Sequence, residues 1–142
     1  MRMDITPLQA VHPGDGGQDY HHQLSDINSN MQTFDEKLCL QWNDFHDSVT
    51  SSFRNLRDDQ DFTDVTLASE DGQQIEAHKV VLIASSPFFL NLLKRNKHPQ
   101  ALVYMRGVKF EDLVSMVEFL YKGEANVHQE NLDSFLALSE EL

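Results

Sequence analysis

The residues of this 142-residue chain that could do chemistry are one cysteine, seven histidines and 23 acidic side chains. Cys39 is the only cysteine, so neither an intrachain disulfide nor a zinc site built on several cysteines can form. It lies in an alternating strand pattern, where an inert structural cysteine is expected. The sequence has no glycine-rich phosphate loop, no G-x-S-x-G turn and no H-E-x-x-H motif. We therefore expect no catalytic residue, no metal and no cofactor, and predict that the chain is not an enzyme.

Three of the histidines, His12, His21 and His22, lie in an N-terminal segment of unusual composition. Residues 1–34 hold three of the six glycines and two of the four prolines, and their apolar residues follow no lasting period. Such a composition is typical of a disordered segment. A metal site also needs more ligands on a fixed frame. The sequence predicts a disordered leader over residues 1–34 and a folded domain over residues 35–142.

The excess of acidic residues argues against nucleic acids and anionic membranes as partners. Lysine and arginine total 11 against 23 acidic residues, which gives a formal net charge of −12. Phosphate binding depends on clustered lysine and arginine, so we expect no contact with nucleic acid or with an anionic membrane surface. No apolar run has the length of a membrane helix, and residues 1–10 lack the core of a signal peptide. We expect a cytosolic or nuclear protein.

The predicted domain begins with a strand and a helix that share an apolar character. Leu38, Leu40 and Trp42 alternate with more polar residues, which predicts a half-buried strand. Asn43 or Asp44 can then cap a helix. One face of that helix collects Phe45, Val49, Ser52, Phe53 and Leu56. These apolar residues need cover, either from the domain's own core or from a second subunit, and the pattern alone leaves both open.

The remaining elements predict an α+β domain with few strands and many helices. Residues 62–68 and 73–77 form a predicted hairpin around Asp71-Gly72, and strands are also expected over residues 101–105 and 125–127. Helices are predicted over residues 78–84, from Ser86-Pro87 onward, over residues 110–122 and at the end of the chain. The helix that follows Ser86 is apolar almost all round and is expected to be buried.

Several of these segments resemble the BTB/POZ domain family. Residues 62–67 read FTDVTL, residues 77–82 AHKVVL, residues 85–89 SSPFF and residues 119–124 FLYKGE, with Val108 and Asp112-Leu113 in between. The motifs stand in the family's order, and the similarity covers roughly residues 35–142. The leading Leu38-x-Leu40-x-Trp42-Asn43 looks like the Tramtrack group, found mostly in arthropod transcription factors.

This resemblance implies a small mixed sheet flanked by helices, in a domain that homodimerises by exchanging its N-terminal strand and first helix. Assemblies larger than dimers are associated with the Tramtrack group. The implied interface consists of Leu38, Leu40, Trp42, Phe45, Val49 and Phe53. The implied function is oligomerisation and cofactor docking in a nuclear transcription regulator of development. Its partners would be itself, related BTB domains and transcriptional cofactors, with DNA binding in a region absent from this chain.

Charged residues add two further expectations. In the family, the aspartate of the D-V motif and the basic residue after A-H line a pocket near the dimer groove, which maps to Asp64 and Lys79. Because an unpaired buried carboxylate is costly, we expect an ion pair that supports the dimer more than a direct contact with a partner. The cluster Lys94, Arg95 and Lys97 has two interpretations. It is either favourable charge at a helix C-terminus or a docking patch for an acidic partner.

The alternative function is that of a substrate adaptor of a cullin-type ubiquitin ligase. Such adaptors usually carry a hydrophobic-x-Glu element after the third helix. Here residues 92–99 read LLKRNKHP, which is basic and contains no glutamate, so the adaptor function is disfavoured. The chain stops inside the expected last helix, and we therefore expect a fragment whose C-terminal end is truncated.

Overall fold

The computed structural model describes residues 2–7, by their backbone alone, and residues 37–142. The chain divides into two compact units, residues 1–45 and residues 46–142, which are described separately. Most of the predicted disordered leader, including His12, His21 and His22, lies outside the described residues.

The first unit contains an antiparallel pair of strands, β1 (Arg2–Pro7) and β2 (Leu38–Asn43). The register places Met3 opposite Trp42 and Ile5 opposite Leu40. β2 coincides with the strand predicted from its alternating residues. β1 lies within the segment for which the sequence predicts disorder. Its apolar residues do alternate, but over too short a run to stand out, and the edge of β2 offers main-chain partners.

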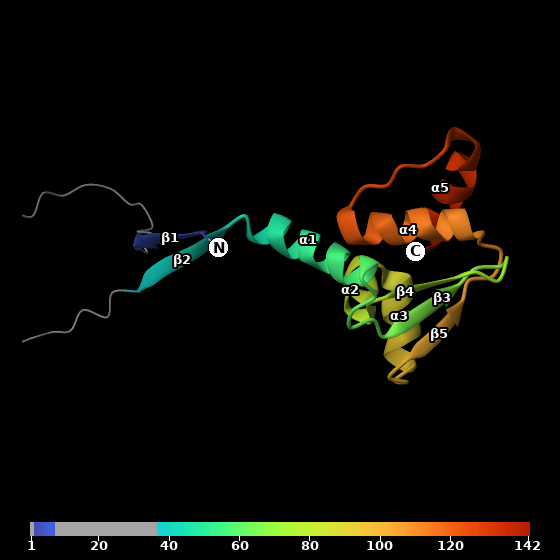
Figure 1. Ribbon diagram of the computed structural model, residues 1–142, viewed down its shortest axis with the longest axis horizontal. Helices are drawn as coiled ribbons and strands as arrows, with labels where there is room; N and C mark the ends of the chain where they lie inside the picture. Colours follow the sequence, from blue (N-terminus) through green and yellow to red (C-terminus); the bar gives the residue numbers. More distant parts are fainter. Residues whose placement is uncertain (1, 8–36) are drawn as a thin grey trace, which may run out of the picture. The chain divides into compact units, whose positions relative to one another are not determined.

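The second unit is built on a three-stranded sheet with the order β4-β3-β5 (Figure 1). Its strands are β3 (Val65–Ala68), β4 (Gln74–Ala77) and β5 (Ala101–Tyr104). β4 runs antiparallel to β3, and β5 runs parallel to it. The strand predicted from Phe62 begins only at Val65, because Phe62 has a left-handed φ of 57° that a strand does not accommodate.

The turn between β3 and β4 combines a backbone and a side-chain requirement. Gly72 has a φ of 80°, in the left-handed region that favours glycine. The hydroxyl of Ser69 donates to the carboxylate of Asp71. This hydrogen bond lowers the pKa of the Asp71 carboxyl below its ordinary value, because it stabilises the charged form.

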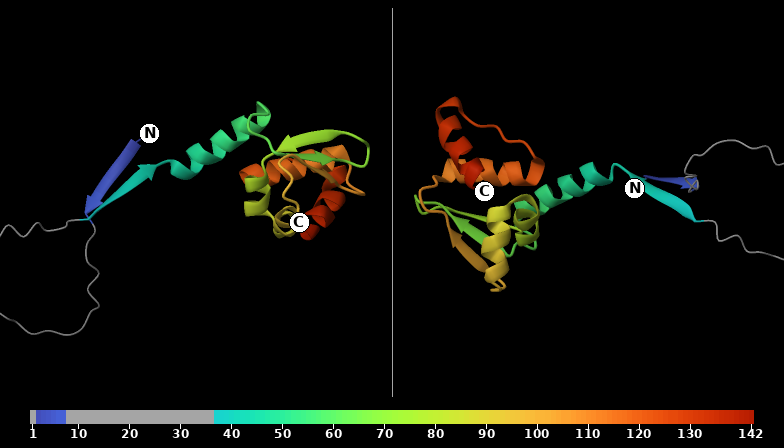
Figure 2. Two further views of the ribbon diagram at one scale, coloured as in Figure 1. Left: turned by 90° about the horizontal axis from the view of Figure 1, so that it is seen from below. Right: turned by 180° about the vertical axis from the view of Figure 1, so that it is seen from behind.

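Helices supply the rest of the domain, and Figure 2 shows α2 to α5 gathered around the sheet. They are α1 (Phe45–Asp58), α2 (Lys79–Ser85), α3 (Pro87–Arg95), α4 (Phe110–Lys122), the 3-10 turn η1 (Gln129–Asn131) and α5 (Leu132–Glu141). The hydroxyl of Ser86 caps α3 by accepting from the N–H of Phe89 at 3.4 Å. Gly123, with a φ of 77°, ends α4 as predicted.

The core lies between the inner face of the sheet and helices α2 to α5. Its most completely buried apolar side chains are Val65, Leu67, Leu82, Phe89, Leu113, Met116 and Val117. Each such side chain contributes about 1.5–3 kcal/mol through removal of apolar surface from water. The predicted α+β architecture, a small mixed sheet flanked by helices, is confirmed.

Two expectations about local structure are wrong. α3 buries Phe89 and Leu93, but Phe88, Leu90 and Leu92 remain 38–41% exposed, because only one side of the helix meets the core. Residues 125–127 form no strand among the described residues, since no strand there pairs with them.

Candidate protein-interaction site

The six residues predicted to form an interface lie on β2 and α1, and together we call them the leading face: Leu38, Leu40, Trp42, Phe45, Val49 and Phe53. Leu38, Leu40 and Phe45 are 54%, 60% and 44% exposed in the single chain. The other three are half-buried, and Phe53 packs partly against the core. The first four residues belong to the first unit, and Val49 and Phe53 belong to the second. Exposed large apolar side chains in each unit are typical of surfaces that bind another protein.

The helix α1 has an apolar side, yet none of its residues is buried. At its start, the rings of Trp42 and Phe45 meet edge to face, with their centroids 5.1 Å apart. Asp44, one of the two predicted caps, has a φ of 60°, whereas a capping residue normally has extended backbone. α1 therefore draws little stability from burial in its own chain.

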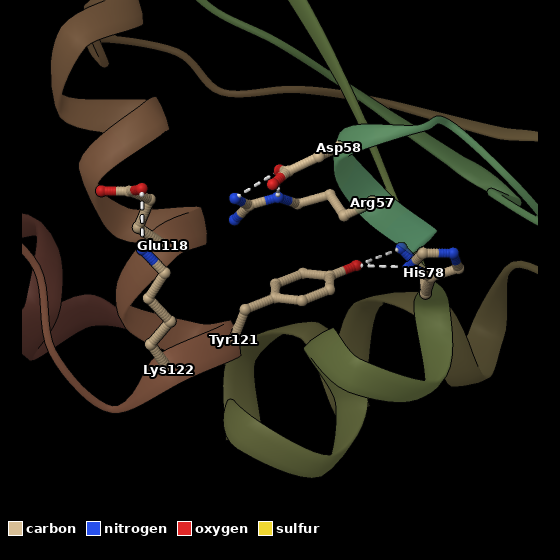
Figure 3. A network of polar contacts seen from close by, with 6 residues as sticks. All are labelled: Arg57, Asp58, His78, Glu118, Tyr121 and Lys122. Carbon is tan, nitrogen blue, oxygen red and sulfur yellow. Dashed lines mark hydrogen bonds and ion pairs between the residues drawn. The ribbon is translucent and has the colours of Figure 1, made fainter. Parts of the chain in front are cut away.

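The C-terminal end of α1 is tied to the domain by a buried polar network around His78 and Tyr121 (Figure 3). The main-chain N–H of His78 donates to the Tyr121 hydroxyl at 2.8 Å, and the same hydroxyl lies 2.7 Å from Nδ1 of His78. Nε2 of His78 lies 2.7 Å from the carbonyl oxygen of Asp61. Since a carbonyl only accepts, Nε2 carries the proton and Nδ1 accepts from Tyr121.

Arg57, in the last turn of α1, covers the other side of this network (Figure 3). Its guanidinium carbon lies 4.9 Å from the centroid of the Tyr121 ring, and its Nη2 lies 2.9 Å from a carboxylate oxygen of Asp58. Nη1 is buried and has no hydrogen-bond partner among the described residues. The face of the aromatic ring compensates for this in part. Burial raises the pKa of Tyr121 above its ordinary value.

Asp64 and Lys79 are in contact, but the contact joins the side chain of Asp64 to the main chain of Lys79. A carboxylate oxygen of Asp64 accepts from the N–H of Lys79 at 2.7 Å. The ammonium of Lys79 instead donates to the carbonyl of His98. Asp64 thus places a negative charge at the N-terminus of α2, where the helix dipole favours it. No ion pair within the described part of the chain joins the two side chains, so the predicted pairing is not formed there.

The basic cluster lies at the end of α3. Lys94 and Arg95 are in its last turn and Lys97 follows it, and all three are exposed. Their position fits the helix dipole, and their exposure equally leaves them open to an acidic partner.

Residues 37–142 contain neither a cluster of metal ligands nor a membrane-spanning helix. No group of three or more histidine, cysteine, aspartate or glutamate side chains in that range could hold a metal ion. None of the helices there is both long and apolar enough to cross a membrane. The candidate site consists of the leading face and the charged residues described above.

The sequence profile of the BTB/POZ domain family matches residues 53–142. The chain belongs to the BTB/POZ family. This confirms the resemblance predicted from the motifs around Asp64, His78, Ser86 and Tyr121. The BTB domain of zebrafish PATZ1 has the same fold, with a TM-score of 0.63 over 70% of this chain and 81% of that one. The two are 21% identical, so this likeness shows the fold alone.

Relatives of this BTB/POZ chain come from Drosophila melanogaster. It is 52% identical over 109 residues to the Broad-complex core protein isoforms 1/2/3/4/5, and 39% identical over 112 residues to Protein tramtrack, alpha isoform. These matches cover 75% and 79% of this chain, but only 15% and 14% of those proteins. Longitudinals lacking protein-like is 45% identical over 112 residues, which cover 79% of this chain and 87% of that protein.

Sequence reasoning did not find the network of Arg57, Asp61 and Tyr121. Tyr121 falls on the buried stripe of α4, where an aromatic residue is indistinguishable from an ordinary core residue. Arg57 lies in a charged stretch at the end of the first predicted helix, where the sequence indicates no partner for it. The one available signal is His78 directly before a helix, where a polar side chain can support the turn, and its hydrogen bonds are consistent with that role.

Proposed function

We propose that this BTB/POZ chain is a self-associating domain that joins copies of itself and docks transcriptional cofactors. The observation that carries the proposal is the leading face. Its six residues on β2 and α1 are all apolar, and none of them is buried in the single chain. The membership of the BTB/POZ family supports the same function.

A second copy fits the leading face for physical reasons. β1 and β2 form a sheet of two strands, and such a sheet is marginally stable in water unless it packs against something. Exchange of β2 and α1 about a two-fold axis covers the same face on both copies at once. A stable interface buries about 1,200–2,000 Å² in total, and large side chains such as Trp42 and Phe45 contribute well to it.

The proposal places the domain in a nuclear regulator of transcription that acts in development. Relatives with names such as Broad-complex core protein and Sex determination protein fruitless support this context. The chain spans 15% and 12% of those proteins, so the other activities of such a regulator belong to regions outside the match. We assign DNA binding to such a region, because a net charge of −12 disfavours contact with phosphate.

Asp64, Lys79 and the basic cluster have secondary roles in the proposal. Asp64 and Lys79 support the dimer by fixing the start of α2 and the loop at His98. Lys94, Arg95 and Lys97 form a docking patch for an acidic partner.

Light scattering on the 142-residue chain over a range of concentrations tests the self-association. We expect a mass of at least two protomers that persists on dilution, and masses above the dimer if larger assemblies form. The variant with Leu38→Ser, Leu40→Ser and Trp42→Ser should have a lower mass and retain its helical circular dichroism.

A matched variant controls for the loss of exposed apolar side chains in general. Leu90→Ser, Leu132→Ser and Leu136→Ser change residues of α3 and α5 that are 41–49% exposed. We expect this variant to keep the parental mass. If the β2 variant also kept the parental mass, β2 would not be part of the interface.

A further inference from the structure

β5 presents an unpaired edge of the sheet. β3 is its only partner among the described strands. The N–H of Met105 donates to the carbonyl of Ala68 at 2.8 Å, and that of Ala101 donates at 3.2 Å to the carbonyl of the residue before β3. Successive residues of a strand direct their N–H and C=O groups to opposite sides. The main-chain groups of Leu102 and Tyr104 therefore point away from β3, as a template for another strand.

The side chains of these two residues are open as well. Leu102 is 62% exposed and Tyr104 is 59% exposed, whereas Ala101 and Val103 are buried. Proteins commonly protect an edge strand with a lysine, a proline or a bulge, and the four residues of β5 include no lysine or proline. An apolar edge strand with both its backbone and its side chains open is suited to strand addition by a peptide.

A small cavity lies beside the C-terminal end of β5. Its volume is about 270 Å³, and it is lined by the mostly apolar Phe88, Tyr104, Met105, Val108, Leu138 and Leu142 together with the charged Arg106 and Glu141. The cavity is bounded by α3 and α5 as well as by the strand. It offers space for an apolar side chain of a segment that runs along β5.

β5 also lies in the middle of a strongly basic stretch of an acidic chain. Residues 94–109 contain five of the 11 lysines and arginines and none of the 23 acidic residues. The five are Lys94, Arg95, Lys97, Arg106 and Lys109, and all of them are exposed. A segment with negative charges is therefore attracted to this edge, in contrast to the rest of the domain.

The positive charge is concentrated at the start of β5. The loop that holds Lys97 is ordered by two hydrogen bonds of 3.1 Å, from the N–H of His98 to Oδ1 of Asn96 and from the N–H of Gln100 to Nδ1 of His98. At the other end, the N–H of Glu70 donates to the carbonyl of Val108, which brings an acidic residue near the strand. The acidic residues of a partner should accordingly lie near Lys97.

We propose that the free edge of β5 binds an extended acidic peptide of a partner protein as an added strand. Apolar residues at alternate positions of the peptide lie against Leu102 and Tyr104, and its acidic residues lie next to Lys94, Arg95 and Lys97. The site extends the docking role proposed above and specifies the chemistry of the partner. It uses no residue of the leading face.

A second copy of the chain is a poorer occupant of the same edge. Antiparallel pairing of two β5 strands about a two-fold axis at Val103 would bring the basic residues that flank each strand near those of the other copy. Both basic stretches would then lie side by side, and like charges opposite one another destabilise strand pairing. The distribution of charge therefore favours an acidic peptide.

Fluorescence anisotropy with a labelled synthetic peptide tests the proposal on the full 142-residue chain. The probe is a peptide of about ten residues in which valine and threonine alternate and glutamates stand at both ends. We expect saturable binding, and binding about tenfold weaker for the same peptide with lysine in place of glutamate. Hydrogen exchange at the amides of Leu102 and Tyr104 should slow when the acidic peptide is added.

Two matched double variants test the charge contribution. Lys94→Glu with Lys97→Glu should weaken binding of the acidic peptide about tenfold or more. Lys37→Glu with Arg54→Glu makes the same change of net charge at exposed residues outside the basic stretch and should leave binding unchanged. Equal binding of the acidic and basic peptides, or unchanged exchange at Leu102 and Tyr104, would overturn the proposal.

The variant Leu102→Lys separates this site from self-association. It should abolish peptide binding and leave the mass measured by light scattering unchanged. A lower mass with no effect on the peptide would make β5 a contact between copies and would also overturn the proposal. Because mass and peptide binding are measured on one sample, failure of the β5 site is distinguishable from failure of the leading face.

Discussion

Tyr121 and His78 lie 43 residues apart in the sequence, and one hydroxyl of Tyr121 satisfies two buried polar atoms of His78, its main-chain N–H and Nδ1. Through Nε2 the same histidine reaches the carbonyl of Asp61, just beyond α1. The start of α2, the last turn of α4 and the end of α1 are therefore joined by one pair of side chains. This pair positions the C-terminal end of the helix that carries much of the leading face.

Substitution of Tyr121 by phenylalanine should lower the free energy of unfolding by about 1–3 kcal/mol at neutral pH. The change keeps the ring but leaves Nδ1 and the N–H of His78 without a buried partner. Urea unfolding followed by circular dichroism measures the difference. Ser115→Ala, on the same helix, is a control that should change stability by less than about 0.5 kcal/mol.

The same substitution should alter the stability of the domain in alkali. The pKa of Tyr121 is raised in the folded state, mainly by burial, from an ordinary value of 10.0. Its stabilising contribution is therefore complete below pH 10 and is lost as the pH rises through the folded-state pKa. Parent and Tyr121→Phe should converge in stability above pH 10. An unchanged difference at high pH would mean that Tyr121 does not titrate differently in the two states.

Asp64 and Lys79 should respond unequally to substitution. Asp64→Ala removes the acceptor for the first N–H of α2 and should cost about 1–2 kcal/mol of stability. Lys79→Met keeps the main-chain N–H that Asp64 binds and should cost less than about 1 kcal/mol. Equal costs in chemical denaturation would instead favour a side-chain ion pair formed in the assembly.

Substitutions in α1 should reduce the assembled mass, whereas substitutions in the core should reduce the stability of the protomer. Val49→Ser changes a half-buried residue of the leading face, so it should reduce the assembled mass and cost a protomer little stability at high dilution. Leu113→Ala leaves a cavity at a fully buried position and should cost about 2–5 kcal/mol. Light scattering and urea titration at several protein concentrations measure both effects. A large loss of stability for Val49→Ser in the dissociated protomer would place this residue in the core.

Ser69→Ala should raise the pKa of Asp71 toward its ordinary value of 3.8, because the hydroxyl that stabilises the carboxylate is removed. In the parent the depressed pKa contributes stability above pH 3.8, and this contribution is lost as the pH falls through the folded-state value. The variant should show less of this acid dependence. Titration of the carboxyl carbon by NMR measures the shift directly, and an unchanged pKa would assign the effect to other groups.

Much of the fold could be predicted because local patterns and tertiary packing agree in this chain. The alternation around Leu40 gives β2, and the stripe that ends at Gly123 gives α4. Predictions failed where the outcome depends on neighbours. Phe62 looked like the start of a strand, but its left-handed backbone places it in a turn. β1 depends on the presence of β2 more than on its own six residues.

The candidate site was predictable to a smaller extent. The residues of the leading face were named from periodicity and family resemblance, since both depend on short segments. The free edge of β5 could not be found this way, because strand order decides which strand lies at the margin of a sheet. The contact of Asp64 with the main chain of Lys79 was missed for a related reason. An aspartate in a sequence suggests a cationic side chain as its partner, and nothing in the sequence marks a main-chain N–H as the partner instead.

The absence of buried residues in α1 has a consequence for how fast the protein is degraded in a cell. A helix that its own chain covers only in part gains stability from a partner that covers the rest, so its stability rises with the concentration of that partner. Newly made protomers at low abundance would open at α1 first and be exposed to proteases there. Assembled copies would be protected from proteases. A doubling of the rate of synthesis would then more than double the amount of protein in the cell.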